Sequence, residues 1–152
     1  MSQENVEIAR KWIAFADAGD LPSIVDLLDP DVECFPAEGD PEAAPFRGRD
    51  AFARQAASTR EVFDERTVEA LEYVDLGEYV AVVARITSVG MASRAPVSME
   101  EVWLVRFRNG KCVEYRECGT KDRALELADL AGRSRRCRRS NSEGTARRGV
   151  LP

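Results

Sequence analysis

The chain has 152 residues, of which 44% are hydrophobic and 32% charged, and its formal net charge is −5. This size and composition are typical of one globular domain with a core of its own. No apolar stretch is long enough to cross a membrane, and the N-terminus lacks the basic-then-apolar pattern of a secretory signal, so we expect a cytoplasmic protein.

The first third of the chain shows the patterns of short helices around one strand. Apolar residues at helical spacing predict helices over 5–17 and 22–28. A strand over 32–36 follows, and then a loop over 37–47 that is rich in proline, glycine and acidic residues. A third helix begins near 48–50.

The rest of the body consists of predicted strands. They extend over 67–75, 79–89, 97–108 and 111–118, and the last two are joined by Asn109-Gly110, which is typical of a tight hairpin. Helices followed by a meander of antiparallel strands predict an α+β fold with the helices on one face of a curved sheet.

The C-terminal part differs in charge from the body. A helix over 121–131 is expected to end at Gly132, and the arginine-rich tail over 132–152 is expected to be disordered. That tail carries a net charge of +6, against −11 for 1–131. Such a tail could bind nucleic acid or an acidic partner, but it has no interleaved aromatic residues, so we favour a dispensable extension and do not expect nucleic-acid binding.

Four segments carry a pattern through their order and spacing: Trp12–Leu21, Asp31-Val32, Phe46–Asp50 and Val105–Lys111. Together they resemble the nuclear transport factor 2-like superfamily, and within it the SnoaL-like and ketosteroid isomerase-like proteins. The likeness extends over about 5–131. It implies a cystatin-like cone, in which a strongly curved antiparallel sheet wraps around N-terminal helices and encloses one apolar cavity. It also implies homodimers packed through the outer face of the sheet.

The resemblance places the three working residues of ketosteroid isomerases in this chain. The tyrosine donor falls at Trp12, the general-base aspartate at Pro36, and the protonated aspartic acid of the oxyanion hole at Trp103. An indole offers only an N–H donor and proline offers no side-chain group, whereas that reaction needs a base and two donors. Steroid isomerisation is therefore not expected, and whether the chain is an enzyme stays open.

The chain contains no histidine, which narrows the possible chemistry further. Nucleophile pairs with histidine are excluded. The polyketide cyclase and scytalone dehydratase chemistries of similar proteins, which use histidine, are disfavoured, and no Asp-Arg-Asp set of an epoxide hydrolase can be placed. The four cysteines form no C-x-x-C pair. We expect them to be reduced, and we expect neither a metal nor a cofactor.

Strand parity suggests which side chains face the cavity. If Trp103 points inward, so does Glu101, two residues before it. A two-residue hairpin loop would set Trp103 opposite Arg116. A three-residue loop, which we favour, sets Trp103 opposite Tyr115 and Glu101 opposite Glu117.

This arrangement predicts a catalytic set of Glu101, Glu117 and Tyr115. Two carboxylates that face each other in a cavity cannot both stay ionised easily, so one pKa should rise and that group could act as a general acid or base. Alternatively, one or both lie at the mouth of the cavity, solvated or paired with Arg85 or Arg106. The residues expected to contact a ligand are apolar: Trp12, Phe15, Pro36, Phe63 and Trp103.

Three functions are compatible with these features. The first is a pocket that binds a small hydrophobic molecule without chemistry, and the second is an isomerase, cyclase or hydrolase that uses a pocket glutamate. The third is a dimeric interaction scaffold with a basic tail. Val102 and Leu104 are expected on the outer sheet face, where a twofold partner would cover them, so we expect a homodimer.

Overall fold

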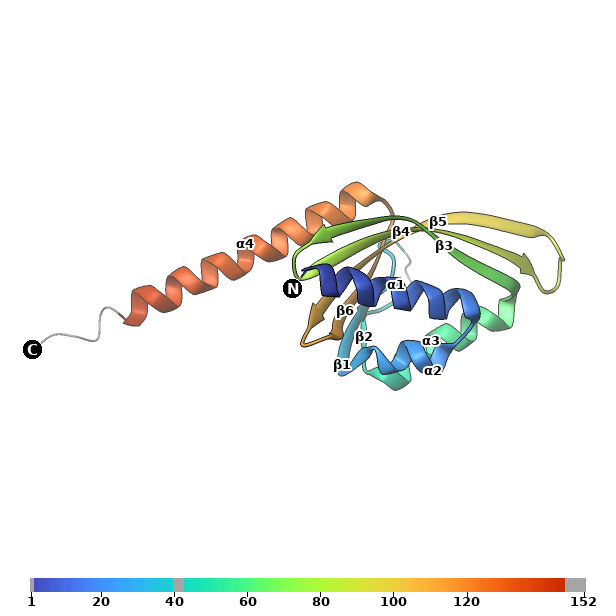
Figure 1. The fold of residues 1–152 in the computed structure, drawn as a ribbon, viewed down its shortest axis with the longest axis horizontal. Helices are drawn as coiled ribbons and strands as arrows, with labels where there is room; N and C mark the ends of the chain where they lie inside the picture. The colour runs from blue at the N-terminus through green and yellow to red at the C-terminus, as the bar shows by residue number, and fades with distance from the viewer. Residues whose placement is uncertain (1, 40–42, 147–152) are drawn as a thin grey trace, which may run out of the picture.

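A six-stranded sheet curves over three helices in the computed structural model, which describes residues 2–39 and 43–146 (Figure 1). The elements in chain order are α1 (Ser2–Ala18), α2 (Leu21–Asp26), β1 (Leu28–Phe35), β2 (Phe46–Arg47), α3 (Arg49–Val62), β3 (Phe63–Leu76), β4 (Tyr79–Gly90), β5 (Pro96–Arg108), β6 (Lys111–Cys118) and α4 (Lys121–Ala146). The strand order is β2-β1-β6-β5-β4-β3. This arrangement confirms the predicted α+β class, with a curved sheet and N-terminal helices.

The sheet is mixed, and the prediction of a wholly antiparallel sheet is wrong in one place. Strand β1 runs parallel to β6, with Cys34 beside Tyr115, whereas the other neighbouring strands are antiparallel. The two strands are far apart in the sequence, so no tight hairpin turn fixes their relative direction. The parallel pair brings the end of β1 to the same edge of the cavity as β6.

Local contacts hold the N-terminal helices against the inner face of the sheet. Gly19 takes a positive φ of 72° between α1 and α2, a conformation that a residue without Cβ adopts at little cost. Asp20 caps α2, since its carboxylate accepts a hydrogen bond from the backbone N–H of Ser23 at 3.2 Å. The Asp17 carboxylate accepts a hydrogen bond from the backbone N–H of Val68 at 2.9 Å. This last bond ties the end of α1 to β3.

The β5–β6 hairpin closes with a two-residue turn rather than the favoured three-residue loop. Arg108 pairs with Lys111 across Asn109-Gly110, and both turn residues have positive φ. The pairing then shifts by one residue, because Val113 of β6 has no partner in β5. Such a bulge changes which side chains of the bulged strand share a face with the partner strand.

The bulge determines which residues of β6 reach the inner face. It sets Trp103 opposite Glu117 and Val105 opposite Tyr115, so neither of the two predicted registers is correct. The two-residue turn and the one extra residue in β6 nevertheless have the same effect as a three-residue loop on which β6 side chains face inward. Tyr115 and Glu117 therefore lie on the same face as Trp103, but Glu101 is a diagonal neighbour of Glu117 and not its direct partner.

The outer face of the sheet is covered by α4. Val102 and Leu104 are buried there in a cluster with Ala124, and Leu127 and Ala131 pack against it. The apolar pair that suggested a twofold partner is thus covered by the same chain, and that reason for a homodimer does not hold.

Helix α4 does not end at Gly132, as expected, but continues to Ala146. Disorder of the tail in solution remains a prediction. Contacts of two arginines stabilise the helix beyond the glycine, which costs about 1 kcal/mol in a helix interior. Arg133 pairs with Asp129 one turn earlier at 3.1 Å. Arg135 pairs with Glu78 and stacks its guanidinium over the Tyr79 ring. The remainder of the predicted tail, 147–152, lies outside the described residues.

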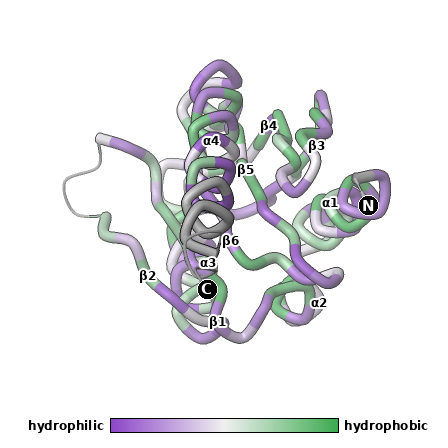
Figure 2. The backbone as a smooth tube through the Cα atoms, turned by 90° about the vertical axis from the view of Figure 1, so that its left-hand side faces the viewer, coloured by the Kyte–Doolittle hydropathy of each residue, from purple (hydrophilic) through white to green (hydrophobic). Residues whose placement is uncertain are grey.

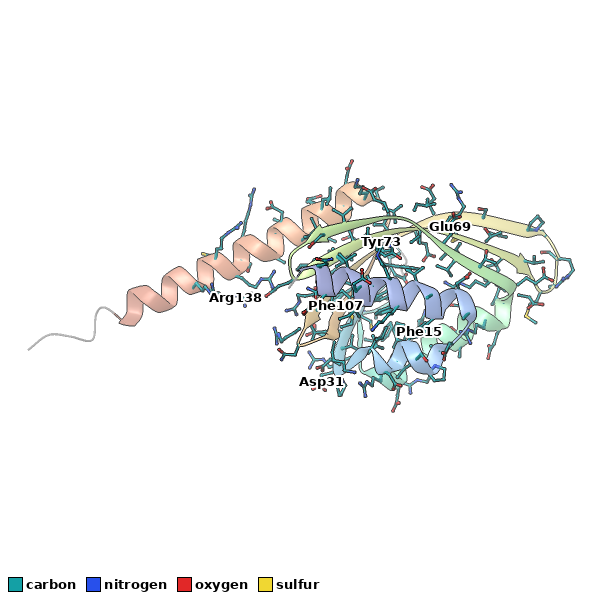
Figure 3. All side chains as sticks on the ribbon, in the orientation of Figure 1. Phe15, Asp31, Glu69, Tyr73, Phe107 and Arg138 are labelled. Atoms are coloured by element: carbon teal, nitrogen blue, oxygen red, sulfur yellow. The ribbon has the colours of Figure 1, made fainter. Side chains whose placement is uncertain are left out.

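The exposed half of α4 projects away from the body. Arg138, labelled in Figure 3, lies well beyond the sheet. Hydrophobic and hydrophilic residues are interspersed along the backbone of the strands and the N-terminal helices (Figure 2). Within 2–39 and 43–146, no helix is both long and apolar enough to cross a membrane.

Candidate functional site

A cavity of about 440 Å³ lies between the inner sheet face and the three N-terminal helices. Its volume is in the range of small-molecule sites. The larger apolar side chains around it come from both the helices and the strands, and they include Trp12, Ile24, Phe35, Phe46, Phe52, Phe63 and Trp103. The rim includes exposed charged residues such as Arg60 and Glu65. The cavity therefore combines an apolar wall with a polar entrance.

A cluster of aromatic rings forms one wall. Trp12 and Tyr115 stack with centroids 5.4 Å apart and an interplanar angle of 9°. Phe52 packs edge-on against both rings at 5.8 Å. Trp103 lies tilted against Tyr115 at 6.4 Å. Offset stacked and edge-on pairs stabilise one another, so this wall is a preformed surface for a flat ring.

Two carboxyl groups share the cavity with this wall. Glu101 and Glu117 both line it and are half-buried. Burial raises the pKa of Glu101, and burial together with the negative charge of Glu101 raises the pKa of Glu117. The hydroxyl of Tyr115 donates a long hydrogen bond of 3.5 Å to Oε1 of Glu117. Carboxyls shifted in this direction are suited to general acid–base chemistry near neutral pH.

Tyr115 itself is a poor proton donor in this setting. Its pKa is raised well above the ordinary value, first by burial and then by the charges of Glu117 and Glu101. A phenol with a raised pKa stays protonated, so it can donate a hydrogen bond without losing its proton. The arrangement suits Tyr115 to holding Glu117 in place or to binding a ligand oxygen.

Arg66 of β3 also lines the cavity, and the reasoning from sequence missed it. Its positive charge lowers the pKa values of Glu101, Glu117 and Tyr115, opposing the effect of burial. The predicted strand began at residue 67. The β3–β4 register is irregular between Asp64 and Thr67, so alternation could not have shown where Arg66 points.

The alternative ion-pair partners of the cavity glutamates are engaged elsewhere. Arg85 pairs with Glu100 at 3.6 Å, and Arg106 pairs with Glu114 on the outer face at 3.7 Å. The interpretation that Arg85 or Arg106 neutralises Glu101 or Glu117 is therefore wrong.

Of the residues predicted for the site, seven line the cavity: Glu101, Glu117, Tyr115, Trp12, Pro36, Phe63 and Trp103. Phe15 does not. It packs half-buried against the sheet core from α1, where Figure 3 labels it. The helix turns Trp12 and Ala16 toward the cavity, and Phe15 lies on the neighbouring stripe. The roles of the seven residues remain predictions.

The side chains of this site are poorly suited to nucleophilic catalysis or to metal binding. Cys34 lines the cavity, but burial raises the pKa of its thiol to about 12, and a thiol in that state is a poor nucleophile. In the part of the chain that the structure describes, no group of three or more His, Cys, Asp or Glu residues could hold a metal ion. Proton transfer is the chemistry that the side chains of the cavity suit best.

A curved sheet folded over N-terminal helices around a lined cavity defines the nuclear transport factor 2-like class of proteins. Residues 9–115 match the protein-family model of the SnoaL-like domain, which is more than half of the chain. The chain belongs to the SnoaL-like domain family.

Several solved structures have this fold. A nuclear transport factor 2-like protein of unknown function from Burkholderia pseudomallei is 19% identical, with a TM-score of 0.70, and the match covers 84% of this chain and 96% of that one. TerC, co-crystallised with polyporic acid, is 19% identical with a TM-score of 0.68, and the match covers 83% and 98%. A SnoaL-like protein from Mesorhizobium loti, provisionally assigned as a polyketide cyclase, is 23% identical with a TM-score of 0.58, and the match covers 74% and 96%. At these identities the likeness shows the fold alone. No curated protein matches the chain.

Proposed function

We propose that the cavity binds a small, largely apolar molecule with a flat ring system, and that Glu101 or Glu117 transfers a proton to or from it. The observation that carries this proposal is the placement of two half-buried carboxyls with raised pKa values beside a stacked aromatic wall. Stacking against Trp12 and Tyr115 would orient the ring. A carboxyl at its edge would then be within reach of an acidic carbon–hydrogen or oxygen–hydrogen bond.

The wider family is compatible with this proposal. TerC has the same fold and was crystallised with polyporic acid, and the Mesorhizobium loti protein is provisionally assigned as a polyketide cyclase. These ligands and activities belong to those proteins. They support the idea that a cone of this kind can hold a small organic molecule, and they do not identify the molecule bound here.

The two carboxyls have different partners but interact with each other electrostatically. Glu117 accepts a hydrogen bond from Tyr115, and the negative charge of Glu101 raises its pKa. For Glu101, the positive charge of Arg66 is the largest influence that opposes the effect of burial on its pKa, followed by a hydrogen bond with Trp103. We assign the proton-transferring role to the pair, because two interacting groups titrate as a unit.

Exchange of acidic carbon-bound hydrogens tests the proposal directly. The purified protein is incubated with 2-tetralone in D₂O, and NMR follows the loss of the hydrogens next to the carbonyl. The protein should accelerate exchange, and E101Q/E117Q should lower the acceleration by a factor on the order of 10²–10⁴. Glu100→Gln is the matched control, since Glu100 is exposed and paired with Arg85. If the protein gives no acceleration, or if E100Q loses it equally, the catalytic part of the proposal is wrong.

The predicted homodimer and cytoplasmic location remain predictions. Helix α4 packs on the outer face around Leu104, so a dimer formed through that face would require α4 to move. Sedimentation velocity of the full chain, compared with a chain ending at Thr120, would show whether removing α4 permits association. No specific contact favours the interaction scaffold as a function.

A further inference from the structure

The residues at and just after the end of β1 form one edge of the cavity. Phe35 and Pro36 both line it. The next residue, Ala37, donates a hydrogen bond from its backbone to the carboxyl of Glu117. Burial raises the pKa of Glu117, and this hydrogen bond opposes that effect. The position of a short piece of loop therefore bears directly on one of the two cavity carboxyls.

Two arginines, one on β6 and one on α4, hold this piece of loop. Arg123 donates two hydrogen bonds to the Glu38 carboxylate, from Nη2 to Oε1 at 2.7 Å and from Nε to Oε2 at 3.2 Å. The guanidinium of Arg116 lies over the Phe35 ring, 3.8 Å from its centroid. A paired set of hydrogen bonds fixes a carboxylate in orientation as well as in distance. The residues before and after Ala37 are thus both tied to neighbouring elements.

The side chain of Arg123 is itself held in place. The residue lies in the first turn of α4, where its backbone N–H donates to Oγ1 of Thr120 at 3.2 Å. The Glu126 carboxylate, one turn further along, lies 3.2 Å from Nη1 of Arg123. The hydrogen bonds from Arg123 lower the pKa of Glu38, so that carboxyl stays ionised at neutral pH. The Arg123–Glu38 pair, here called the latch, therefore connects a fixed helix end to the loop.

The other charged or titratable groups that face Glu117 belong to the sheet. They come from β1, β3, β5 and β6, and they are Cys34, Arg66, Glu101, Tyr115 and Cys118. Their positions follow from the pairing of the strands. Ala37, in contrast, lies beyond the last residue of β1. Among these contacts in the described part of the chain, that of Ala37 is the one that a tether outside the sheet must maintain.

We propose that Arg123 is a positioning residue for Glu117 and that it acts through Glu38. The latch keeps the loop against the cavity, so that the backbone N–H of Ala37 stays on the Glu117 carboxyl. The importance of the latch for proton transfer rests on the proposed function. Helix α4, which packs on the outer face of the sheet, thereby contributes to the site on the inner face.

Removal of either partner tests the latch, with the pKa of Glu117 measured by NMR titration of the free, full-length protein. Arg123→Gln and Glu38→Gln should both raise that pKa, each by about 0.5 pH unit, because each releases Ala37. The double variant should give the same rise as either single variant, since all three lose one shared interaction. Thermal unfolding verifies that each variant is folded.

The direction of the two shifts separates the latch from a simple effect of charge. Loss of the positive charge of Arg123 would raise the pKa of Glu117 through space, but loss of the negative charge of Glu38 would lower it. A rise in both variants is therefore expected only if the loop is released. Arg123→Lys keeps the charge and part of the pair, so it should raise the pKa less than R123Q does.

Lys121→Gln is the matched control. Lys121 lies in the same turn of α4 and pairs with Glu72 of β3 at 2.8 Å, so K121Q removes the same charge without touching the loop. It should leave the pKa of Glu117 unchanged. The latch is wrong if E38Q lowers that pKa or leaves it as it is, or if K121Q raises it as much as R123Q does.

Exchange of the 2-tetralone hydrogens shows whether the latch matters for the reaction. The pH midpoint of the exchange rate should move upward in R123Q and E38Q together with the pKa of Glu117. An unchanged midpoint despite a raised pKa would mean that Arg123 has no positioning role in proton transfer. If the wild-type protein does not accelerate exchange at all, the proposed proton transfer fails, and the titration of the free protein still decides whether the latch holds Ala37 on Glu117.

Discussion

Strands β5 and β6 carry buried or half-buried carboxylates on both faces of the sheet. The carboxylates on the two faces differ in their hydrogen-bond and ion-pair partners. On the outer face, Glu114 is 8% exposed and has three partners. The hydroxyl of Tyr79 donates to it at 2.8 Å, Arg116 lies at 3.1 Å and Arg106 at 3.7 Å. On the inner face, Glu101 and Glu117 form no ion pair with any residue that the structure describes. Glu117 accepts a long hydrogen bond from Tyr115 and one from the backbone of Ala37, and Glu101 accepts one from the indole of Trp103.

This difference indicates that the two faces of the same two strands have different roles. A buried charge with a complete set of partners fixes the packing of its surroundings, and removing it leaves those partners unpaired. A carboxyl without an ion pair in a cavity is costly to the fold and available to a ligand. We therefore expect changes on the outer face to affect stability and changes on the inner face to affect binding and proton transfer.

The largest expected effect on stability is on the outer face. Leu104 is fully buried beneath α4. Leu104→Ala should lower the free energy of unfolding by about 2–5 kcal/mol, as measured by urea denaturation. Leu130→Ala is the control, because Leu130 of α4 is 50% exposed and its loss should change stability little. Equal losses in the two variants would mean that α4 does not cover this face.

Glu114→Gln should have the next largest effect. It removes the charge shared by Arg106 and Arg116 and weakens the acceptor for Tyr79, so we expect a loss of about 2–3 kcal/mol. The affinity of the cavity for 2-tetralone should stay the same, because Glu114 is on the opposite face. A variant with full stability and altered affinity would reverse the proposed division between the faces.

The inner carboxyls should make stability depend on pH in the opposite way to paired carboxylates. Burial raises the pKa values of Glu101 and Glu117, so the native state holds these protons more tightly than the unfolded state. Their contribution to stability is therefore full at low pH and is lost as the pH rises from the ordinary glutamate range through the raised values.

Thermal unfolding between pH 4 and pH 8 measures this effect by comparing the wild-type protein with E101Q/E117Q. Relative to the variant, the wild-type protein should lose on the order of 1 kcal/mol as the pH rises. A difference between the two proteins that is independent of pH would contradict the raised pKa values.

The smallest expected effect concerns the exposed half of α4. Arg135→Ala removes the pair with Glu78 and the contact with Tyr79, and it should cost about 0–1 kcal/mol. The total helix content measured by circular dichroism should fall slightly, because the C-terminal end of α4 loses contacts with the body. Arg136→Ala on the exposed side of the same turn is the control and should change neither. A loss of several kcal/mol in R135A would place this part of α4 within the structural core.

Periodicity was sufficient for the body of the fold. Apolar spacing located α1, α2 and the four long strands, because each element buries one face and its pattern follows from that burial. It did not show that β1 runs parallel to β6, since strand direction is set by a contact between segments far apart in the chain. The length of α4 was missed because Gly132 resembles a helix end, and the contacts of Arg135 that outweigh it come from another strand.

The candidate site was predicted only in part, because the prediction relied on the alternation of side chains along regular strands. Alternation placed Glu101 and Trp103 on one face, and the parity of Tyr115 and Glu117 was right only because the bulge at Val113 compensates for the shorter turn. Arg66 could not be assigned, since the irregular start of β3 breaks the alternation there.

The most direct test of the account is an NMR titration of the glutamate side-chain carboxyls in the free protein. Two signals should titrate above the ordinary glutamate range, one absent in E101Q and the other in E117Q, and both should move higher in Arg66→Met because the opposing charge is gone. If every glutamate titrates in the ordinary range, or if R66M leaves the two signals unchanged, then Glu101, Glu117 and Arg66 do not share one cavity and the account is wrong.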